Sequence, residues 1–140
     1  MITVITGPPC SGKTTWARQH AKPGDLIIDF DVIAQALGSP VTHGHDDAYR
    51  KAALDARDAA ITAAVSRSPE NTRAWIIDSR PAAGKRAWYK AHGARFVALS
   101  AEPAELHRRA DADHRPPSWH QRIDQFLADT ASPVEPRTRW

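Results

Sequence analysis

One stretch of the sequence combines residue types and spacing that point directly to chemistry. Positions 7 to 14 follow the pattern G-x-x-x-x-G-K-T, and every fixed position of the pattern is filled. The glycines permit a loop whose backbone N–H groups converge on phosphate oxygens. Lys13 can then reach the β- and γ-phosphates of a nucleoside triphosphate, and the Thr14 hydroxyl can bind Mg²⁺. The predicted nucleotide-binding residues are Gly7, Pro8, Pro9, Cys10, Ser11, Gly12, Lys13, Thr14 and Thr15.

Three acidic residues follow apolar runs that read as strands. Asp29 and Asp31 end the second run, and Asp78 ends the third. A phosphoryl-transfer enzyme needs a carboxylate that orients the acceptor hydroxyl and takes its proton, and we assign this role to Asp31. Asp29 is the alternative candidate for the base, or a partner near Mg²⁺. The competing interpretation of Asp31 is that it only caps the N-terminus of the next helix. Asp78 has the setting of a metal-binding acid beside Thr14, with a turn-capping role as its alternative.

Several arginines lie on or after the helix expected near residue 103. Phosphoryl transfer requires fixed positive charge around the moving group, and arginines on a mobile segment can provide it. Arg109 and Arg115 are the candidates for such a lid, and Arg109 also for nucleotide binding. Ordinary solvated arginines are the competing interpretation.

Two further polar regions have less specific patterns. Residues 80–95 contain five cations with Trp88 and Tyr89 among them, and no acid. This composition suits either a nucleic-acid path or, with slight preference, a solvated helix face over core aromatics. The loop that carries His43, His45, Asp46 and Asp47 is interpreted as a polar substrate-side loop rather than as a metal site, because it lacks a ligand-spacing signature.

These groups must be positioned by alternating strands and helices. Strands are expected at 2–6, 25–29, 73–78 and 94–99, and helices at 14–20, 32–37, 48–67, 81–91, 103–110 and 119–128. Three of the strands are nearly continuous apolar runs, as in a parallel sheet covered on both faces. The fold class is therefore α/β, in three layers around a mostly parallel four-stranded sheet. Because ligands gather at the carboxyl ends of such strands, the motifs should line one rim.

Composition limits the possibilities further. The chain has 140 residues, of which 41% are hydrophobic and 25% charged, which fits a single domain over 1–130 with a loose tail over 131–140. The net charge of +3 permits a polyanionic partner without requiring one. Cys10 is the sole cysteine, so no internal disulfide forms and a reducing cytoplasm is expected. No apolar run approaches the roughly 18 residues that span a bilayer, so we expect no membrane partner.

Several segments together carry a resemblance to known proteins. They are residues 7–18, Asp29-Phe30-Asp31, Ile76-Ile77-Asp78-Ser79, Arg86-Ala87-Trp88, residues 102–109 and Arg115-Pro116-Pro117. These segments are similar to P-loop kinases, and most of all to the 5′-hydroxyl kinase domain of bacteriophage polynucleotide kinase. In that family an aspartate at the place of Asp31 activates the acceptor, and the segment like 102–109 is a lid helix. Three residues beyond this aspartate the family has an arginine, whereas this sequence has Ala34.

The resemblance implies a P-loop kinase fold and transfer of the γ-phosphate of ATP, with Mg²⁺, to a hydroxyl. The implied acceptor is a nucleic-acid 5′-hydroxyl, a base-linked hydroxyl, a nucleoside or a nucleotide. A small-metabolite kinase and a nucleotide-binding switch with little catalysis remain as alternatives. The sequence predicts neither the preference between ATP and GTP nor the oligomeric state.

Overall fold

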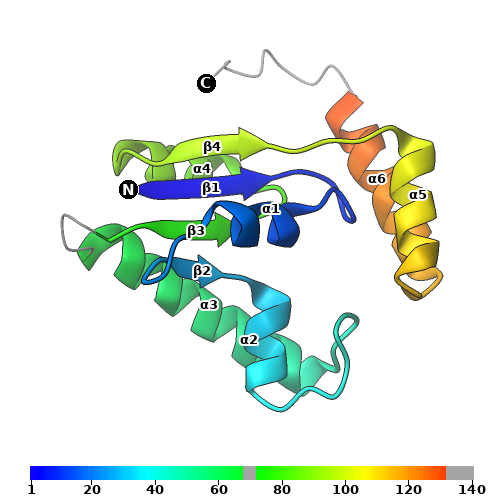
Figure 1. Ribbon diagram of the computed structural model, residues 1–140, viewed down its shortest axis with the longest axis horizontal. Coiled ribbons are helices and arrows are strands. Elements are labelled where there is room, and N and C mark those ends of the chain that lie inside the picture. The colour runs from blue at the N-terminus through cyan, green and yellow to red at the C-terminus, as the bar shows by residue number, and fades with distance from the viewer. Residues whose placement is uncertain (68–71, 132–140) are drawn as a thin grey trace.

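The computed structural model describes residues 1–67 and 72–131. Within these ranges the chain forms a four-stranded sheet in the order β2-β3-β1-β4 (Figure 1). The strands are β1 (Ile2–Thr6), β2 (Leu26–Ile28), β3 (Ala74–Ile77) and β4 (Arg95–Ala98). Each pair of neighbouring strands is parallel, so the carboxyl ends of all four lie at one edge of the sheet. The parallel sheet expected from the apolar runs is confirmed.

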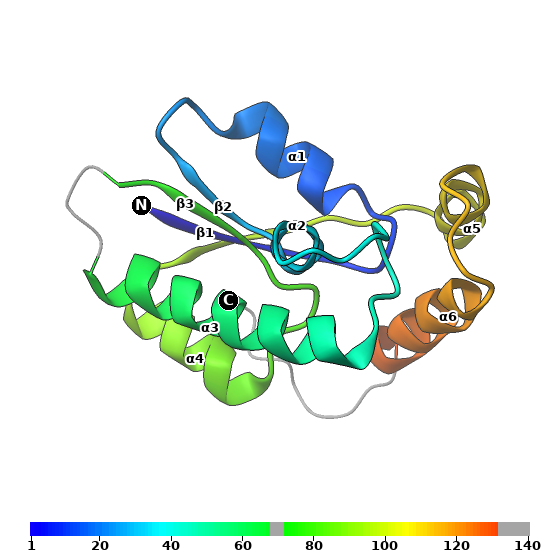
Figure 2. The ribbon, with the colours of Figure 1, turned by 90° about the horizontal axis from the view of Figure 1, so that it is seen from below.

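The helices cover both faces of the sheet and one end of it. They are α1 (Lys13–His20), α2 (Phe30–Ala36), α3 (Asp47–Arg67), α4 (Ala83–Ala91), α5 (Pro103–Ala112) and α6 (Ser118–Ala131). In Figure 2, α1 lies on one face, α3 and α4 lie on the other, and α5 and α6 stand together beyond the strand ends. This is the expected three-layer α/β arrangement. None of the helices in the described ranges has the length and apolar character needed to cross a membrane.

The hydrophobic core is divided by the sheet. On one face, Val4 and Ile76 pack with Ile61 of α3 and Tyr89 of α4. On the other face, Ile5 and Trp75 pack with Ala17 of α1. Since the central strands are buried on both faces, their sequences are continuous apolar runs rather than alternating ones.

Helices α5 and α6 have a small core of their own. Leu106 and Ala110 of α5 pack against Ile123 of α6, and the half-buried Cys10 of the phosphate loop joins this cluster from outside. The pair is therefore held to the body of the protein partly through that loop. The tail expected over 131–140 falls outside the described residues, apart from Ala131, which ends α6.

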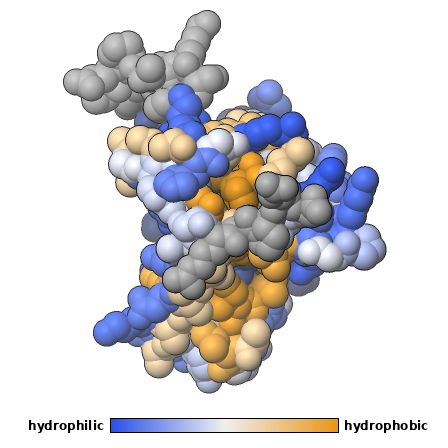
Figure 3. All heavy atoms as spheres, turned by 90° about the vertical axis from the view of Figure 1, so that its left-hand side faces the viewer, coloured by the Kyte–Doolittle hydropathy of each residue, from blue (hydrophilic) through white to orange (hydrophobic). Residues whose placement is uncertain are grey.

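The amino ends of the strands form the side of the molecule away from α5 and α6. Figure 3 faces this side and shows hydrophobic residues at the surface among charged ones. Met1 is 51% exposed, and Leu26, at the start of the edge strand β2, is 45% exposed. The polar sequence motifs lie at the opposite, carboxyl edge.

Candidate functional site

The phosphate loop connects β1 to α1 and depends on its first glycine. Gly7 has a φ of 142°, and a Cβ atom there would lie 2.4 Å from the carbonyl oxygen of Leu99. Only glycine fits such a position without moving backbone. The Gly7 N–H donates to the carbonyl oxygen of Ser79 at 3.1 Å, which fixes the start of the loop to the end of β3.

Inside the loop, two polar side chains are arranged for an anionic ligand. Lys13 is buried, and its Nζ donates to the carbonyl oxygens of Gly7 at 2.9 Å and Pro8 at 2.7 Å. Burial lowers the pKa of Lys13 to about 8. The Oγ of Ser11 is buried with no hydrogen-bond partner. A phosphate at this position would give Ser11 a partner and stabilise the charged form of Lys13, so the loop fits the phosphates of a nucleotide.

Cys10 contributes backbone and packing to the loop. Its φ of 64° lies in the left-handed region, and its side chain contacts the α5–α6 cluster. Burial raises the pKa of the thiol, although the nearby charges of Arg115 and Lys13 act in the opposite direction. The thiol is therefore protonated at neutral pH, and a nucleophilic role for Cys10 has no support here.

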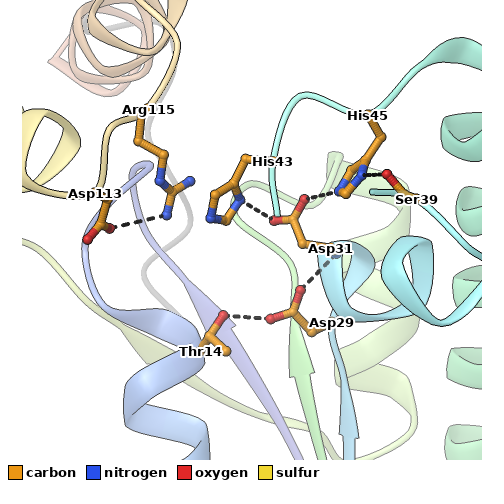
Figure 4. Close-up of polar contacts among 8 residues, drawn as sticks. All are labelled: Thr14, Asp29, Asp31, Ser39, His43, His45, Asp113 and Arg115. Atoms are coloured by element: carbon orange, nitrogen blue, oxygen red, sulfur yellow. Dashed lines mark hydrogen bonds and ion pairs between the residues drawn. The ribbon is translucent and has the colours of Figure 1, made fainter. Parts of the chain in front are cut away.

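Asp29 links the phosphate loop to α2. Its Oδ2 accepts a hydrogen bond from the Thr14 hydroxyl at 2.6 Å, and its Oδ1 accepts one from the backbone N–H of Asp31 at 2.9 Å (Figure 4). Asp29 is thus the N-cap of α2, the role considered above for Asp31. Asp31 lies in the first turn of this helix, which begins at Phe30, two residues earlier than expected.

Asp31 is held by two histidines that sequence reasoning placed only in a polar loop. Its Oδ2 lies 3.1 Å from Nδ1 of His43, and its Oδ1 lies 2.8 Å from Nε2 of His45 (Figure 4). Burial alone would raise the pKa of Asp31, but its interactions with the two imidazoles outweigh burial and hold the pKa below its usual value. The carboxylate is therefore ionised at neutral pH.

Asp78 directly follows β3, as expected, but its contacts are with residues of α3 and α4. It is not among the described residues that line the main cavity. Its Oδ2 lies 3.3 Å from Nη2 of Arg57 and 3.4 Å from Nζ of Lys85, and it accepts a hydrogen bond from the Tyr89 hydroxyl at 3.2 Å. Among the described residues no hydrogen bond joins Asp78 to Thr14, and a cation of α3, together with a cation and a hydroxyl of α4, engages Asp78 instead. The carboxylate that contacts Thr14 is Asp29.

A cavity of about 780 Å³ opens at the carboxyl edge of the sheet. Its walls include the phosphate loop from Pro9 to Thr15, together with Asp29, Asp31 and His43. Opposite these groups the lining is basic and consists of Arg108, Arg109, Arg115 and Arg122. The cavity therefore joins the predicted nucleotide site, the predicted acceptor carboxylate and the predicted lid arginines.

The two lid candidates are held in different ways. Arg109 donates from Nη1 to the carbonyl oxygen of Cys10 at 3.2 Å and from Nε to Glu105 at 2.9 Å. The hydrogen bonds from Arg108 and Arg109 hold the pKa of Glu105 at about 2. Nη2 of Arg115 lies 3.6 Å from Asp113, and its Nε is buried without a partner.

Sequence reasoning missed two residues of α6 that line the cavity. The guanidinium of Arg122 lies 4.2 Å from the centre of the Trp119 ring, and that of Arg115 lies 5.7 Å from it. The available signal was their spacing of three residues, which places Trp119 and Arg122 on one face of a helix.

At least three of the five cations of residues 80–95 have partners within the fold. Arg80 forms an ion pair with Asp129 at 2.7 Å, Lys85 reaches Asp78, and the guanidinium of Arg86 lies 4.5 Å from the centre of the Phe96 ring. This agrees with the slightly preferred interpretation of a helix face over core aromatics. Across residues 1–67 and 72–131, no group of three or more histidine, cysteine or acidic side chains is arranged to hold a metal ion, so the loop of His43 and His45 gains no support as a metal site.

Comparisons with known proteins agree with this geometry. An AAA domain family model matches residues 2–79. A chain in the solved structure described as "Structure of the Pnkp1/Rnl/Hen1 RNA repair complex" is similar in fold, with a TM-score of 0.64 and 14% sequence identity. The match covers 94% of this chain and 46% of that chain, so this chain spans less than half of its neighbour's length. No curated protein sequence matches it.

The family match includes the phosphate loop, both acids after β2 and the whole of β3. It extends over more than half of the 140 residues. The fold, the parallel sheet and the loop that fits phosphate are those of a P-loop kinase-like protein. The chain belongs to the AAA domain family.

Proposed function

We propose that the protein is an ATP- and Mg²⁺-dependent kinase that transfers the γ-phosphate to a hydroxyl of a nucleic acid, nucleoside or nucleotide. One observation carries this proposal. The ionised carboxylate of Asp31 lines the same cavity as Lys13 and Thr14, under a rim of arginines. A nucleotide-binding switch has no need for an ionised carboxylate on the acceptor side of such a cavity.

The donor side consists of the phosphate loop. The loop amides, the Ser11 hydroxyl and Lys13 would hold the phosphates. Thr14 would hold Mg²⁺, since its hydrogen is donated to Asp29 and its oxygen lone pairs stay available. Bound Mg²⁺ supplies charge neutralisation on the phosphates. Asp78, first expected to hold the metal with Thr14, has no part in this proposal.

The acceptor side consists of Asp31 and the arginines. An ionised carboxylate can orient an acceptor hydroxyl, either directly or through a base that it holds in place. Arg109 and Arg115 then stabilise the charge that develops on the transferred group. Because Arg109 is bonded to the carbonyl oxygen of Cys10, it is already positioned against the phosphate loop.

The basic rim favours an acceptor that carries phosphate. Four arginines and Trp119 line the side of the cavity away from β2, and arginine with an aromatic ring suits phosphate and base contacts. The structural neighbour belongs to an RNA repair complex, which supports the same substrate class. A neutral metabolite would make no use of this positive charge.

The test is transfer of labelled γ-phosphate from ATP to a panel of acceptors. The panel contains 5′-hydroxyl DNA and RNA, nucleosides, nucleoside monophosphates and small hydroxylated metabolites, with Lys13→Ala as the blank. Label on a nucleic acid, nucleoside or nucleotide is the expected result. Label found only on a metabolite would show that the acceptor is a small molecule rather than a nucleic acid, nucleoside or nucleotide. Tight ATP binding without any transfer would favour a nucleotide-binding switch.

A further inference from the structure

His43 lies where the acceptor must approach. It belongs to the loop between α2 and α3 and lines both the main cavity and a second one of about 380 Å³. In Figure 4 its ring lies between Asp31 and Arg115. Its side chain is 24% exposed to solvent, so a ligand in the cavity can reach it.

The contact with Asp31 fixes the tautomer of His43. An ionised carboxylate only accepts hydrogen bonds, so Nδ1 of His43, 3.1 Å from Oδ2, must carry the hydrogen. In the neutral ring Nε2 is then the atom with a free lone pair. No residue in the described ranges forms a hydrogen bond with this Nε2.

His45 contacts the same carboxylate but is closed to ligands. Its Nε2 donates to Oδ1 of Asp31 at 2.8 Å, and its Nδ1 accepts from the Ser39 hydroxyl at 2.6 Å. Its side chain is 1% exposed, and the Phe30 ring packs against it edge to face. Both ring nitrogens are used, so His45 fixes the position of Asp31 and cannot accept a further proton from the cavity.

We propose that His43 takes the proton of the acceptor hydroxyl, with Asp31 as the residue that orients its ring. This inference rests on the proposed kinase function. The O–H bond of the acceptor breaks and its proton moves to the Nε2 lone pair. The acceptor oxygen forms a bond to the γ-phosphorus while the bond from that phosphorus to the ADP oxygen breaks. The imidazolium, stabilised by Asp31, later returns the proton to water.

The charges around His43 come from three elements. Asp31, at the start of α2, is its hydrogen-bond partner. Arg115, Asp113 and His114, from the loop between α5 and α6, line the second cavity with it. Lys13 shares the main cavity with it.

The experiment compares His43→Ala with His92→Ala, an exposed histidine whose Nδ1 contacts the Trp88 carbonyl oxygen, away from the cavity. The acceptor is a 5′-hydroxyl oligodeoxynucleotide, or the acceptor that the panel identifies. We expect His43→Ala to lower kcat by about 100-fold or more, with ATP affinity unchanged. Added imidazole should restore at least a tenth of the lost rate, because a free base can occupy the vacated space. His92→Ala should keep the wild-type kcat.

Two kinetic results would overturn the inference while leaving the kinase intact. One is a His43→Ala variant with kcat within threefold of wild type. The other is a loss of kcat that imidazole does not restore, which would make His43 a positioning residue only. Nitrogen-15 NMR of the free protein adds a readout independent of the acceptor, and an Nε2–H tautomer at His43 would also overturn it. Failure of the wild-type protein to phosphorylate any acceptor is a different result, since it removes the proposed function itself.

Discussion

Thr14 and Asp29 are joined by a 2.6 Å hydrogen bond that ties the phosphate loop to the junction of β2 and α2. The same carboxylate caps α2 through the backbone N–H of Asp31. A single buried side chain therefore sets the position of the donor loop relative to the acceptor carboxylate. Changes at Asp29 should disturb stability and catalysis together.

Replacement of Asp29 by alanine tests this coupling. The variant loses the helix cap and leaves the Thr14 hydroxyl without its acceptor, so the free energy of unfolding should fall by about 2 kcal/mol. Urea denaturation measures the change. Asp55→Asn, at an exposed position of α3, is the control and should unfold like the wild type. Equal stability of Asp29→Ala and wild type would contradict the coupling.

Replacement of Asp31 by asparagine tests the acceptor carboxylate. The amide keeps the shape of the side chain but removes the charge that orients the hydroxyl and His43. We expect kcat to fall by at least about 100-fold while the Kd for ATP changes little. Transfer assays and calorimetric ATP titration separate the two effects. Unchanged turnover would remove Asp31 from the acceptor site.

Replacement of Lys13 by methionine should stabilise the nucleotide-free protein. Burial lowers the pKa of Lys13 from 10.5 to about 8, so the folded protein binds fewer protons than the unfolded chain between these pH values. The cost in folding free energy of burying the charged Lys13 is fully present below pH 8, and it disappears as the pH rises toward 10.5. At pH 7 the variant should gain about 1–2 kcal/mol, after loss of its two hydrogen bonds.

The pH dependence provides the check on this explanation. The advantage of Lys13→Met should shrink steadily between pH 8 and pH 10.5, and ATP should no longer raise the Tm of the variant. Lys51→Met, at an exposed position of α3, should show neither effect. An advantage that does not vary with pH would mean that the charge of Lys13 is not its source.

Replacement of Asp78 by asparagine distinguishes a structural role from a metal role. Without its charge, Arg57 and Lys85 lose a shared partner, and the free energy of unfolding should fall by about 2 kcal/mol. The Mg²⁺ dependence of ATP binding should stay as in the wild type, whereas Thr14→Ala should weaken it. A Mg²⁺ titration of nucleotide affinity decides the matter, and a rightward shift for Asp78→Asn would restore the metal assignment.

The sequence was most informative where the determinants are local. The glycines, Lys13 and Thr14 occupy a continuous motif, and the apolar runs of β1 and β3 are recognisable because both faces of these strands are buried. The alternation of strands and helices predicts a parallel sheet, and a parallel sheet places the phosphate loop, Asp29 and Asp31 at one edge because all of them follow strand ends.

The features that the sequence did not indicate depend on contacts between distant segments. Arg57 and Lys85 engage Asp78 from two different helices, and nothing in the residues next to Asp78 indicates them. The cap of α2 fell on Asp29 rather than Asp31 because the helix begins earlier than its apolar residues suggest. His43 contacts Asp31 from a loop, and the path of a loop cannot be predicted from hydrophobic periodicity.

The separate core of α5 and α6 has an evolutionary consequence. Within residues 1–67 and 72–131, every arginine that lines the cavity except Arg57 comes from this one continuous segment. The packing of the segment relies on Leu106, Ala110 and Ile123 rather than on the sheet. A single recombination event could exchange the segment and leave the donor loop and sheet unaltered. Descendants of the same scaffold could in this way acquire new acceptors without redesign of their nucleotide chemistry.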